Sequence, residues 1–314
     1  MNGKQLRLGI DLGGTSAKVG VVDEHAKVLH AVSVPTSEDF DKAADDMAIA
    51  ARQAARLAGM EITDFPFAGA GVPSMINPAT GRMVFANNTG WHDAPMREAL
   101  EKRLGIPVKL ANDANCALLA EAKAGAAQGF AHALMLTLGT GVGSAVIING
   151  HLFPGGDGMG MEAGHLPLVA GGYPCTCGAS GCLEAYVSAT GLAAIAREML
   201  AEHPHSALNA SNMKLTGRTI FGAAEQGDRA ATLIIDRYCE YLAQGIGGLI
   251  TVFRPQVLVI GGGISHAGPP LFDRLNPRVP KYIFAYEHIG GPDMRPAALG
   301  NDAGIVGAAF LDQA

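Results

Sequence analysis

Three of the five cysteines of the chain lie close together in a glycine-rich segment. This segment, residues 162–184, reads E-A-G-H-L-P-L-V-A-G-G-Y-P-C-T-C-G-A-S-G-C-L-E. Three thiolates and one imidazole suit a tetrahedral structural Zn²⁺ site. Glycines allow the tight backbone turns that bring such ligands to one ion, and here they stand at positions 171, 172, 178 and 181. The segment therefore predicts a zinc site with four ligands: His165, Cys175, Cys177 and Cys182.

Two other states of these cysteines are compatible with the pattern. They could be ordinary buried thiols, or Cys182 could form a disulfide with Cys175 or Cys177. A disulfide would leave one odd thiol and needs an oxidising compartment. The chain begins M-N-G-K-Q-L-R and passes directly into apolar residues, without the pattern of an export signal. We therefore expect a cytoplasmic protein, in which zinc is the favoured state of the cluster.

The composition is that of a well-packed globular protein. The chain has 314 residues, of which 48% are hydrophobic and only 17% charged, and its length suggests two domains. No apolar run reaches the length of about 18 residues that a transmembrane helix requires. The net charge of −6 argues against nucleic acid, because phosphate contacts need a basic face. We therefore expect neither a membrane nor a nucleic acid as a partner.

The first apolar segment, Leu6 to Leu12, is predicted to be a strand that ends in a Gly-Gly turn. The turn, D-L-G-G-T-S-A-K, leads into a second strand over Val19 to Val22. Free backbone N–H groups in such a turn can donate to phosphate oxygens, and an acid before them would face a metal bound to that phosphate. A plain hairpin turn would have the same pattern. The turn is not a Walker loop, because the sequence lacks the motif G-x-x-x-x-G-K-[ST] there. The candidate nucleotide-binding residues are Asp11, Gly13, Gly14, Thr15 and Lys18.

Two further glycine-rich turns follow apolar segments. Ala133 to Leu138 leads into L-G-T-G-V-G and then Ser144 to Ile148, which repeats the strand–turn–strand pattern. The repeat suggests a duplicated fold with a nucleotide between its halves. Val257 to Ile260 leads into G-G-G-I-S, where bare backbone would accommodate an adenine, although a tight strand-to-helix turn explains these glycines equally well. The additional nucleotide-binding candidates are Gly139, Thr140, Gly141, Gly261, Gly262 and Gly263.

A polar cluster, A-N-D-A-N, connects a strand predicted over Pro107 to Leu110 with an alanine-rich helix. Open α/β sheets bind ligands at such strand ends. Helix capping by Asn112 or Asp113 is the alternative, but it accounts for only one of the polar residues. We also expect residues 75–92 to be loop-like, with Trp91 as a packing residue. Helical patterns occupy residues 39–57, 94–104, 116–127, 189–201, 218–227, 228–253 and 302–311.

In order and spacing, these motifs resemble those of the ROK family of sugar kinases and repressors, over essentially the whole chain. They are D-L-G-G-T, N-D-A-N, L-G-T-G-V-G, E-A-G-H, C-T-C-G-A-S-G-C-L-E and G-G-G-I-S. The resemblance implies an α/β fold of the two-domain, actin-like (hexokinase/ribonuclease H-like) ATPase class with a central cleft. The smaller domain would comprise residues 1–114, completed by a C-terminal helix in 299–314. The larger domain would comprise residues 115–298 and carry the zinc-binding loop.

The resemblance also implies roles for single residues. Asp113 matches the catalytic base, and Asp11 matches the acid that positions Mg²⁺ through water. The three glycine turns match the ATP-binding turns. Sugar-binding positions of the family match Asn112, Glu162, His165 and Glu184, so His165 would serve both the sugar and the zinc. Many family kinases have G-x-P-G where this chain has G-V-P-S, which places the hydroxyl of Ser74 on the loop that faces the sugar.

The resemblance therefore implies an ATP-dependent kinase that phosphorylates a hexose hydroxyl, and a homodimer. Glucose is the expected sugar, but the change at Ser74 leaves an N-acetylhexosamine, fructose or allose open, and polyphosphate could replace ATP. Repressors of the family carry a DNA-binding segment before the first Gly-Gly turn, where this sequence has only Met1 to Arg7. A catalytically inactive sugar-binding protein would be expected to lack Asp11 or Asp113. Because both acids are present, we expect an enzyme.

Overall fold

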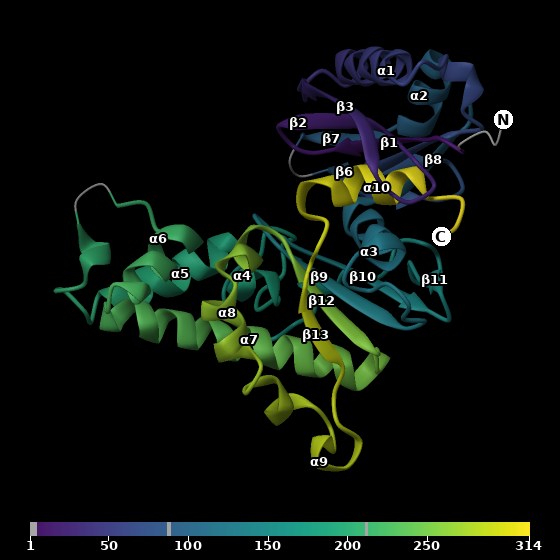
Figure 1. Cartoon of the computed structure of the whole chain (residues 1–314). Coiled ribbons are helices and arrows are strands. Elements are labelled where there is room, and N and C mark those ends of the chain that lie inside the picture. Colours follow the sequence, from purple (N-terminus) through teal and green to yellow (C-terminus); the bar gives the residue numbers. More distant parts are fainter. Residues whose placement is uncertain (1–4, 87–88, 211–212) are drawn as a thin grey trace. The chain divides into compact units, whose positions relative to one another are not determined.

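The computed structural model describes residues 5–86, 89–210 and 213–314, which form a mixed α/β protein (Figure 1). The chain divides into two compact units. The first contains residues 1–133, 145–161 and 298–314, and the second contains residues 134–144 and 162–297. Within the described ranges, no helix has both the length and the apolar character needed to cross a membrane. The domain boundary predicted near residue 114 stays a prediction.

The sheet of the first unit is built on the predicted Gly-Gly hairpin. Its strand order is β3-β2-β1-β4-β8. Strand β2 is antiparallel to both of its neighbours, β1 and β3, and β4 and β8 continue parallel to β1. In the hairpin, Asp11 is paired with Lys18. The strands are β1 (Arg7–Leu12), β2 (Ser16–Val22), β3 (Val28–Pro35), β4 (Ala68–Val72) and β8 (Val108–Asn112). The parallel strands β1, β4 and β8 therefore end at one edge of the sheet.

Four helices belong to this unit: α1 (Phe40–Leu57), α2 (Met96–Leu104), α3 (Asp113–Ala124) and α10 (Ala303–Ala309). Helix α1 packs on β2 and β3, whereas α10 packs on β1, β4 and α3. The approach of α10 to the sheet is very close, because a Cβ atom added at Gly9 would collide with the carbonyl oxygen of Ile305. The C-terminal helix thus becomes part of the first unit through small residues at its contact with β1.

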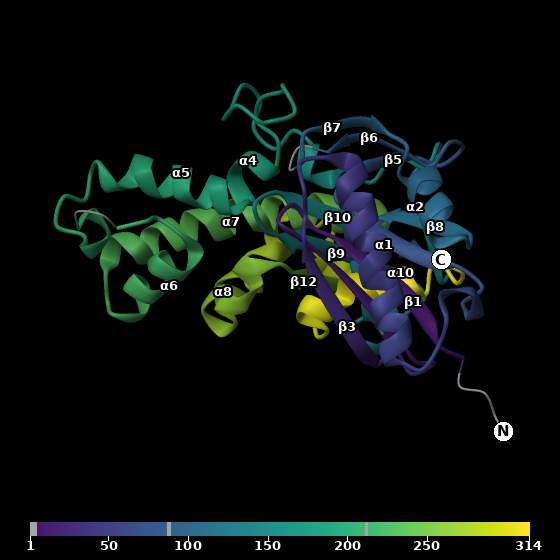
Figure 2. The same ribbon diagram turned by 90° about the horizontal axis from the view of Figure 1, so that it is seen from above.

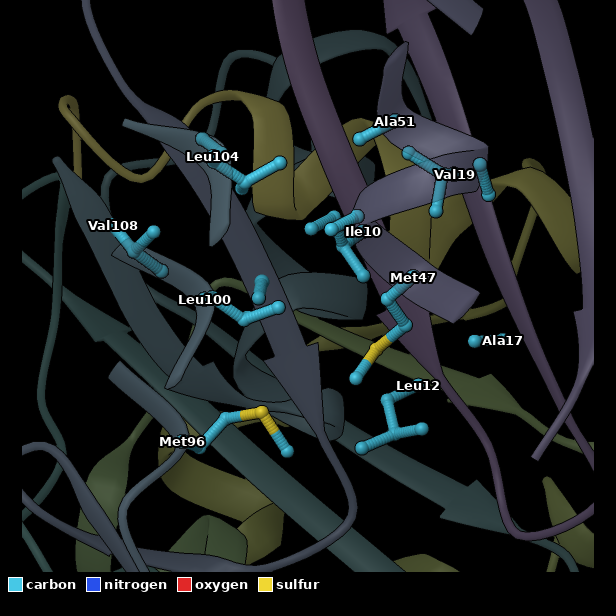
Figure 3. Packing of buried hydrophobic residues seen from close by; sticks show 14 of the residues in the cluster. Ile10, Leu12, Ala17, Val19, Met47, Ala51, Met96, Leu100, Leu104 and Val108 are labelled. Carbon is cyan, nitrogen blue, oxygen red and sulfur yellow. The ribbon is translucent and has the colours of Figure 1, made fainter. Parts of the chain in front are cut away.

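The core of the first unit lies between the sheet and helices α1 and α2. Figure 3 shows side chains from β1, β2, α1, α2 and β8 packed against one another. Met47, Leu100 and Ile10 are at most 1% exposed. Burial of each such side chain contributes roughly 1.5–3 kcal/mol. This packing fixes the ends of β1 and β8, where Asp11 and Asn112 lie.

The prediction of a loop over residues 75–92 was wrong. This segment forms a small antiparallel sheet of β5 (Met75–Asn77), β6 (Arg82–Ala86) and β7 (Trp91–Ala94), while residues 87–88 lie outside the described part. The N-P-A-T-G motif is the hairpin turn between β5 and β6, where the side chain of Asn77 accepts from the N–H of Ala79. Trp91 is a packing residue as predicted, since its ring meets Phe40 edge-on at 5.3 Å and its N–H donates to the carbonyl of Glu38. Very short strands next to turn residues explain why the sequence looked loop-like.

A second five-stranded sheet has the order β11-β10-β9-β12-β13. Its strands are β9 (Ala133–Leu138), β10 (Val142–Ile148), β11 (His151–Leu152), β12 (Val257–Gly261) and β13 (Asp293–Pro296). Strand β9, the L-G-T-G-V-G turn and β10 agree with the second predicted strand–turn–strand unit. The buried strand β12 before the three glycines is also confirmed.

The helices of the second unit are α4 (Glu184–Val187), α5 (Ala189–Leu200), α6 (Gly217–Glu225), α7 (Arg229–Phe253), α8 (Pro269–Leu275) and α9 (Tyr286–Ile289). Helix α5 lies along α7 (Figure 2). In α7, the apolar face predicted from the sequence is buried, and Asp228 caps the first turn by accepting from the N–H of Ala231. Long helices with a clear apolar period are thus the elements that the sequence predicts most accurately.

Candidate functional site

The four predicted zinc ligands converge on one point of the second unit. Their ligand atoms all lie within 4.8 Å of one another. Nδ1 of His165 lies 3.6 Å from Sγ of Cys175, and Sγ of Cys177 lies 3.7 Å from Sγ of Cys182. Zinc bonds of about 2.3 Å to sulfur and 2.0–2.1 Å to nitrogen, in a tetrahedron, separate sulfurs by about 3.8 Å and nitrogen from sulfur by about 3.6 Å. The cluster therefore has the dimensions of a zinc site.

Both alternative states of the cysteines fit the structure less well. All five cysteines are free thiols, and the separation of 3.7 Å between Cys177 and Cys182 is far beyond a disulfide bond of about 2.05 Å. Ordinary core thiols would be enclosed by apolar side chains, but Cys177 is exposed. A cluster of soft donors with one exposed member is better explained by a metal than by packing.

The backbone of the segment between the ligands is folded into a compact loop, which we call the zinc loop (residues 165–184). The N–H of Leu168 donates to the carbonyl of Gly181, and the N–H of Gly181 donates to the carbonyl of Tyr173, both at 2.7 Å. A backbone bond from Cys175 to Ala179 closes the turn that carries two of the sulfurs. The ligands are therefore placed by main-chain hydrogen bonds as well as by the geometry of an ion.

Glu184 joins the zinc loop to the second glycine turn. One of its carboxylate oxygens accepts from the N–H of Val142 at 2.9 Å, and the other accepts from the hydroxyl of Thr176 at 3.3 Å. Val142 directly follows the candidate residues Gly139, Thr140 and Gly141. A predicted sugar-binding residue and a predicted nucleotide-binding turn thus share a hydrogen bond.

The carboxyl of Glu162 senses both His165 and Glu184. Loss of hydration raises the pKa of the Glu162 carboxyl, the positive charge of His165 would lower it, and the negative charge of Glu184 raises it further. Such effects require that both groups lie near Glu162. The structure therefore gathers the three sugar-binding candidates of the second unit around the zinc loop.

The second and third glycine turns also meet. A Cβ atom added at Gly262 would lie 2.5 Å from the main chain of Leu138, the residue before Gly139. Gly263 has open space around it, and it begins a short 3-10 turn in which the Ser265 hydroxyl donates to the carbonyl of Gly262. Gly261 itself is buried as the last residue of β12. The two turns therefore lie side by side, with open space next to Gly263.

The remaining candidates lie on the first unit, at the edge where the parallel strands end. Asn112 caps α3, because its side-chain oxygen accepts from the N–H of Ala114 at 2.8 Å. Asp113 is the exposed first residue of that helix, and its carboxylate also accepts from Ala114. The capping explanation therefore accounts for Asn112. It does not account for an exposed acid beside the cap.

Asp11 lies at the end of β1 and is partly enclosed. Loss of hydration raises the pKa of its carboxyl, whereas the charge of Lys18 lowers it. The thiol of Cys116 is fully buried, and the negative charges of Asp11 and Asp113 add to the rise of its pKa that burial causes. Both acids therefore lie near this thiol, at the same edge of the unit.

Two residues that the sequence reasoning missed help to build this edge. A Cβ atom at Gly304, in α10, would collide with the carboxylate of Asp11. The hydroxyl of Thr36 donates to the carbonyl of Gly13 at 2.8 Å, and its N–H donates to the carbonyl of Thr15 at 3.0 Å. The Gly-Gly turn, including Gly14, is thus held from the end of β3. The small-residue pattern of residues 303–309 was the only signal for Gly304 in the sequence.

Ser74 is directed toward the small sheet. It is 5% exposed, and its hydroxyl lies 2.9 Å from the carbonyl oxygen of Met75 and 2.7 Å from that of Phe85, so its single proton can serve one of them at a time. The carbonyl oxygen of Ser74 lies 3.5 Å from the side-chain nitrogen of Asn112. The hydroxyl therefore connects the G-V-P-S loop to β6, and the main chain of the loop connects to the cluster around Asp113.

Proteins of known function are similar to this chain over nearly its whole length. The chain is 40% identical to a glucokinase of Thermotoga maritima over 312 residues, which cover 97% of this chain and 96% of the relative. It is 32% identical to an N-acetyl-D-glucosamine kinase of Pasteurella multocida, over 98% of this chain and 99% of the relative.

A solved structure has the same fold. The ROK family glucokinase of Streptomyces griseus, in complex with glucose and AMPPNP, superposes with a TM-score of 0.84 at 31% identity, and the match covers 98% of both chains. This similarity confirms the predicted actin-like α/β class. The family model matches residues 7–314, nearly the whole sequence. The chain belongs to the ROK family.

Proposed function

We propose that this protein is an ATP-dependent sugar kinase that phosphorylates a hexose hydroxyl, with Asp113 as the general base. The observation that carries the proposal is the position of Asp113, an exposed acid at the N-terminus of α3 next to a helix cap that Asn112 already provides. Its carboxylate accepts from the same N–H of Ala114 as the cap and remains exposed at the end of the helix. A positioned carboxylate that accepts the hydroxyl proton contributes on the order of 10²–10⁴ to the rate.

The other residues would bind and orient the reactants. In this proposal Asn112, Glu162, His165 and Glu184 pair with sugar hydroxyls, so that one hydroxyl faces Asp113. Nδ1 of His165 faces the sulfur of Cys175, which leaves Nε2 as the ring nitrogen for the sugar. A site that pairs particular hydroxyls rejects analogues that leave its polar groups unpaired.

The phosphate donor would be bound by backbone rather than by side chains. The three glycine turns present N–H groups and open surface to ATP, and Asp11 would hold Mg²⁺ through water. Asp11 fits that role, since a cation would compensate the loss of hydration of its carboxyl. Mg²⁺ would neutralise part of the negative charge of the phosphates. Zinc would have a structural role only, which is to fix the loop that carries His165 and Glu184.

Glucose is the proposed sugar, with glucose 6-phosphate as the product. It is supported by the higher identity to the glucokinase (40%) than to the N-acetyl-D-glucosamine kinase (32%). The inward hydrogen bonds of Ser74 also mean that its hydroxyl does not by itself demand a different sugar. N-acetylhexosamines, fructose and allose are the alternatives, and polyphosphate is the alternative donor.

An assay of ADP release tests this proposal directly. The protein is supplied with Mg²⁺-ATP and, one at a time, glucose, mannose, fructose, allose, N-acetylglucosamine and N-acetylmannosamine. We expect the highest kcat/KM with glucose. Turnover that is fastest with an N-acetylated sugar would replace glucose in the proposal, and no turnover with any sugar would refute the kinase function. Replacement of ATP by polyphosphate identifies the donor.

The proposal also includes a homodimer in the cytoplasm. It further includes two domains: the smaller contains residues 1–114 and 299–314, and the larger contains residues 115–298. The dimer is an expectation from the family resemblance, and neither it nor the location rests on a contact within the chain. Light scattering after size-exclusion chromatography gives the molar mass in solution. A mass near that of one 32.3 kDa chain would reject the dimer.

A further inference from the structure

Three tyrosine rings in contact, which we call the tyrosine stack, lie between the zinc loop and the helical part of the second unit. Tyr173 belongs to the loop, Tyr186 to α4 and Tyr241 to α7. The rings of Tyr173 and Tyr186 are stacked, with centroids 4.7 Å apart and planes 13° from parallel. The ring of Tyr241 follows at 4.5 Å from that of Tyr186 and is tilted from it by 44°. Tyr186, which is 3% exposed, is therefore the central member that connects loop and helix.

A main-chain hydrogen bond fixes the loop to the same residue. The hydroxyl oxygen of Tyr186 accepts from the N–H of Tyr173 at 2.8 Å. The adjacent position must be glycine, because a Cβ atom at Gly172 would collide with that hydroxyl. The sequence pattern G-G-Y thus has a specific purpose: it lets the phenol reach the backbone of the loop.

The stack is supported from outside as well. The hydroxyl of Tyr173 donates to Glu198 on α5, and Glu198 forms an ion pair with Arg237 on α7 at 3.2 Å. None of these contacts involves the four zinc ligands. The middle of the zinc loop is consequently joined to α4, α5 and α7 by interactions that do not depend on an ion.

We propose that Tyr186 is a second anchor of the zinc loop, independent of the metal, and that it positions His165 and Glu184 for the sugar. Glu184 is the first residue of α4 and lies two positions before Tyr186. His165 is the first residue of the zinc loop, and Tyr186 binds the middle of that loop. The inference rests on the proposed function, because sugar binding by His165 and Glu184 is part of that proposal.

The experiment compares two tyrosines that each lose one hydroxyl. Tyr186→Phe removes the bond to the loop and keeps the ring. Tyr238→Phe is the matched control, because the hydroxyl of Tyr238 also makes one hydrogen bond to backbone. It donates to the carbonyl of Val187 at 2.8 Å and does not touch the loop. Both variants are purified with zinc and measured below their melting temperatures.

For Tyr186→Phe we expect the zinc content of the wild type, a KM for the sugar about tenfold higher and a kcat within about twofold of the wild type. Hydrogen exchange of the peptide that contains the Tyr173 N–H should accelerate. Tyr238→Phe should change neither KM nor this exchange. Gly172→Ala, which displaces the phenol, should reproduce the effect of Tyr186→Phe. An unchanged KM and exchange in Tyr186→Phe would overturn the proposal.

Removal of zinc by a chelator completes the test. Each change should accelerate hydrogen exchange of the loop. If the two anchors are independent, the free-energy changes calculated from the exchange rates for chelation and for Tyr186→Phe should add up when both are applied. Loss of zinc from Tyr186→Phe itself would show that Tyr186 acts through the metal and would also overturn the inference. Exchange and zinc content do not require catalysis, so the anchor can be judged even if the ADP-release assay refutes the kinase function.

Discussion

At the scale of single residues, the site depends on acids whose surroundings differ. Asp113 is exposed beside a helix cap, whereas Asp11 is partly enclosed and has a raised carboxyl pKa. Glu184 is held by the N–H of Val142. These differences agree with three tasks: an accessible base, an acid that faces a cation, and a fixed hydrogen-bonding group. The residue types were readable in the sequence, but their surroundings were not.

Asp113→Asn should reduce kcat by a factor of at least about 10². The amide keeps the size of the side chain and can still accept from Ala114, so the melting temperature should stay within about 2 °C of the wild type. Steady-state kinetics and thermal unfolding measure the two quantities. Asp39→Asn at the cap of α1 is the control, since Asn and Asp cap helices equally well and this site is remote from the proposed chemistry. Wild-type kcat in Asp113→Asn would exclude it as the base.

Gly304→Ala should impair the use of the nucleotide more than it impairs folding. The added methyl group would displace the carboxylate of Asp11, which is the movable end of a side chain. Gly307→Ala, three residues along the same helix, would instead meet the main chain of Cys116, which cannot yield easily. We expect a raised KM for Mg²⁺-ATP in the first variant, and a loss of about 1–3 kcal/mol of unfolding free energy in the second. The same stability loss and the same kinetics in both variants would contradict this distinction.

At the scale of elements, the zinc loop is the part of the chain on which the proposed sugar site depends. Its sulfur ligands lie between His165 and Glu184, so an ion held by them would limit the motion of both. The tyrosine stack and the main-chain bonds act on the same loop. The sequence pattern predicted the four side chains that the structure gathers into a cluster consistent with zinc, because thiolate spacing is a local property. It did not reveal Tyr186, whose partners come from the zinc loop and from α7.

Cys177→Ala should lose most of the zinc and, with it, most of the activity, although the residue would touch no substrate. Three remaining ligands bind zinc more weakly than four, and the loop would then rely on its other contacts. Elemental analysis and the ADP-release assay measure the two effects together. Cys239→Ala is the control, because Cys239 is a buried thiol of α7 and should leave the zinc content unchanged. Full activity without zinc would separate the sugar site from the metal.

At the scale of the whole molecule, a single buried acid joins parts of the first unit that are distant in sequence. Glu121 of α3 is 0% exposed, and its carboxylate accepts from the N–H groups of Ala126, Ala298 and Leu299 at 2.7–2.9 Å. Ala298 is also the point at which the chain returns to the first unit. The position of α10, and therefore of Gly304, depends in part on this carboxylate.

Glu121→Ala should lower the unfolding free energy by at least about 3 kcal/mol, since three part-buried N–H groups lose their carboxylate acceptor together. Urea unfolding measures the change. Glu101→Ala, which removes one bond to the N–H of Val108, should cost only about 1 kcal/mol. Equal losses in the two variants would mean that the bonds of Glu121 contribute little beyond a single hydrogen bond.

The sequence by itself determined the local features. It predicted the two Gly-Thr hairpins, the His/Cys cluster, the apolar face of α7 and the family, because strand periodicity, ligand spacing and motifs are encoded in neighbouring residues. It failed for residues 75–92, where strands of three to five residues give too little periodicity to be distinguished from a loop.

Only the tertiary structure decided which distant residues meet. The contacts of Gly304 with Asp11, of Thr36 with Gly13 and of Val142 with Glu184 join separate elements. No single-sequence pattern encodes such pairs, because each depends on how helices and strands pack. The cysteine-rich segment illustrates both sides: its spacing specified four ligands for an ion, whereas the packing of Tyr186 determined how the loop around them is held.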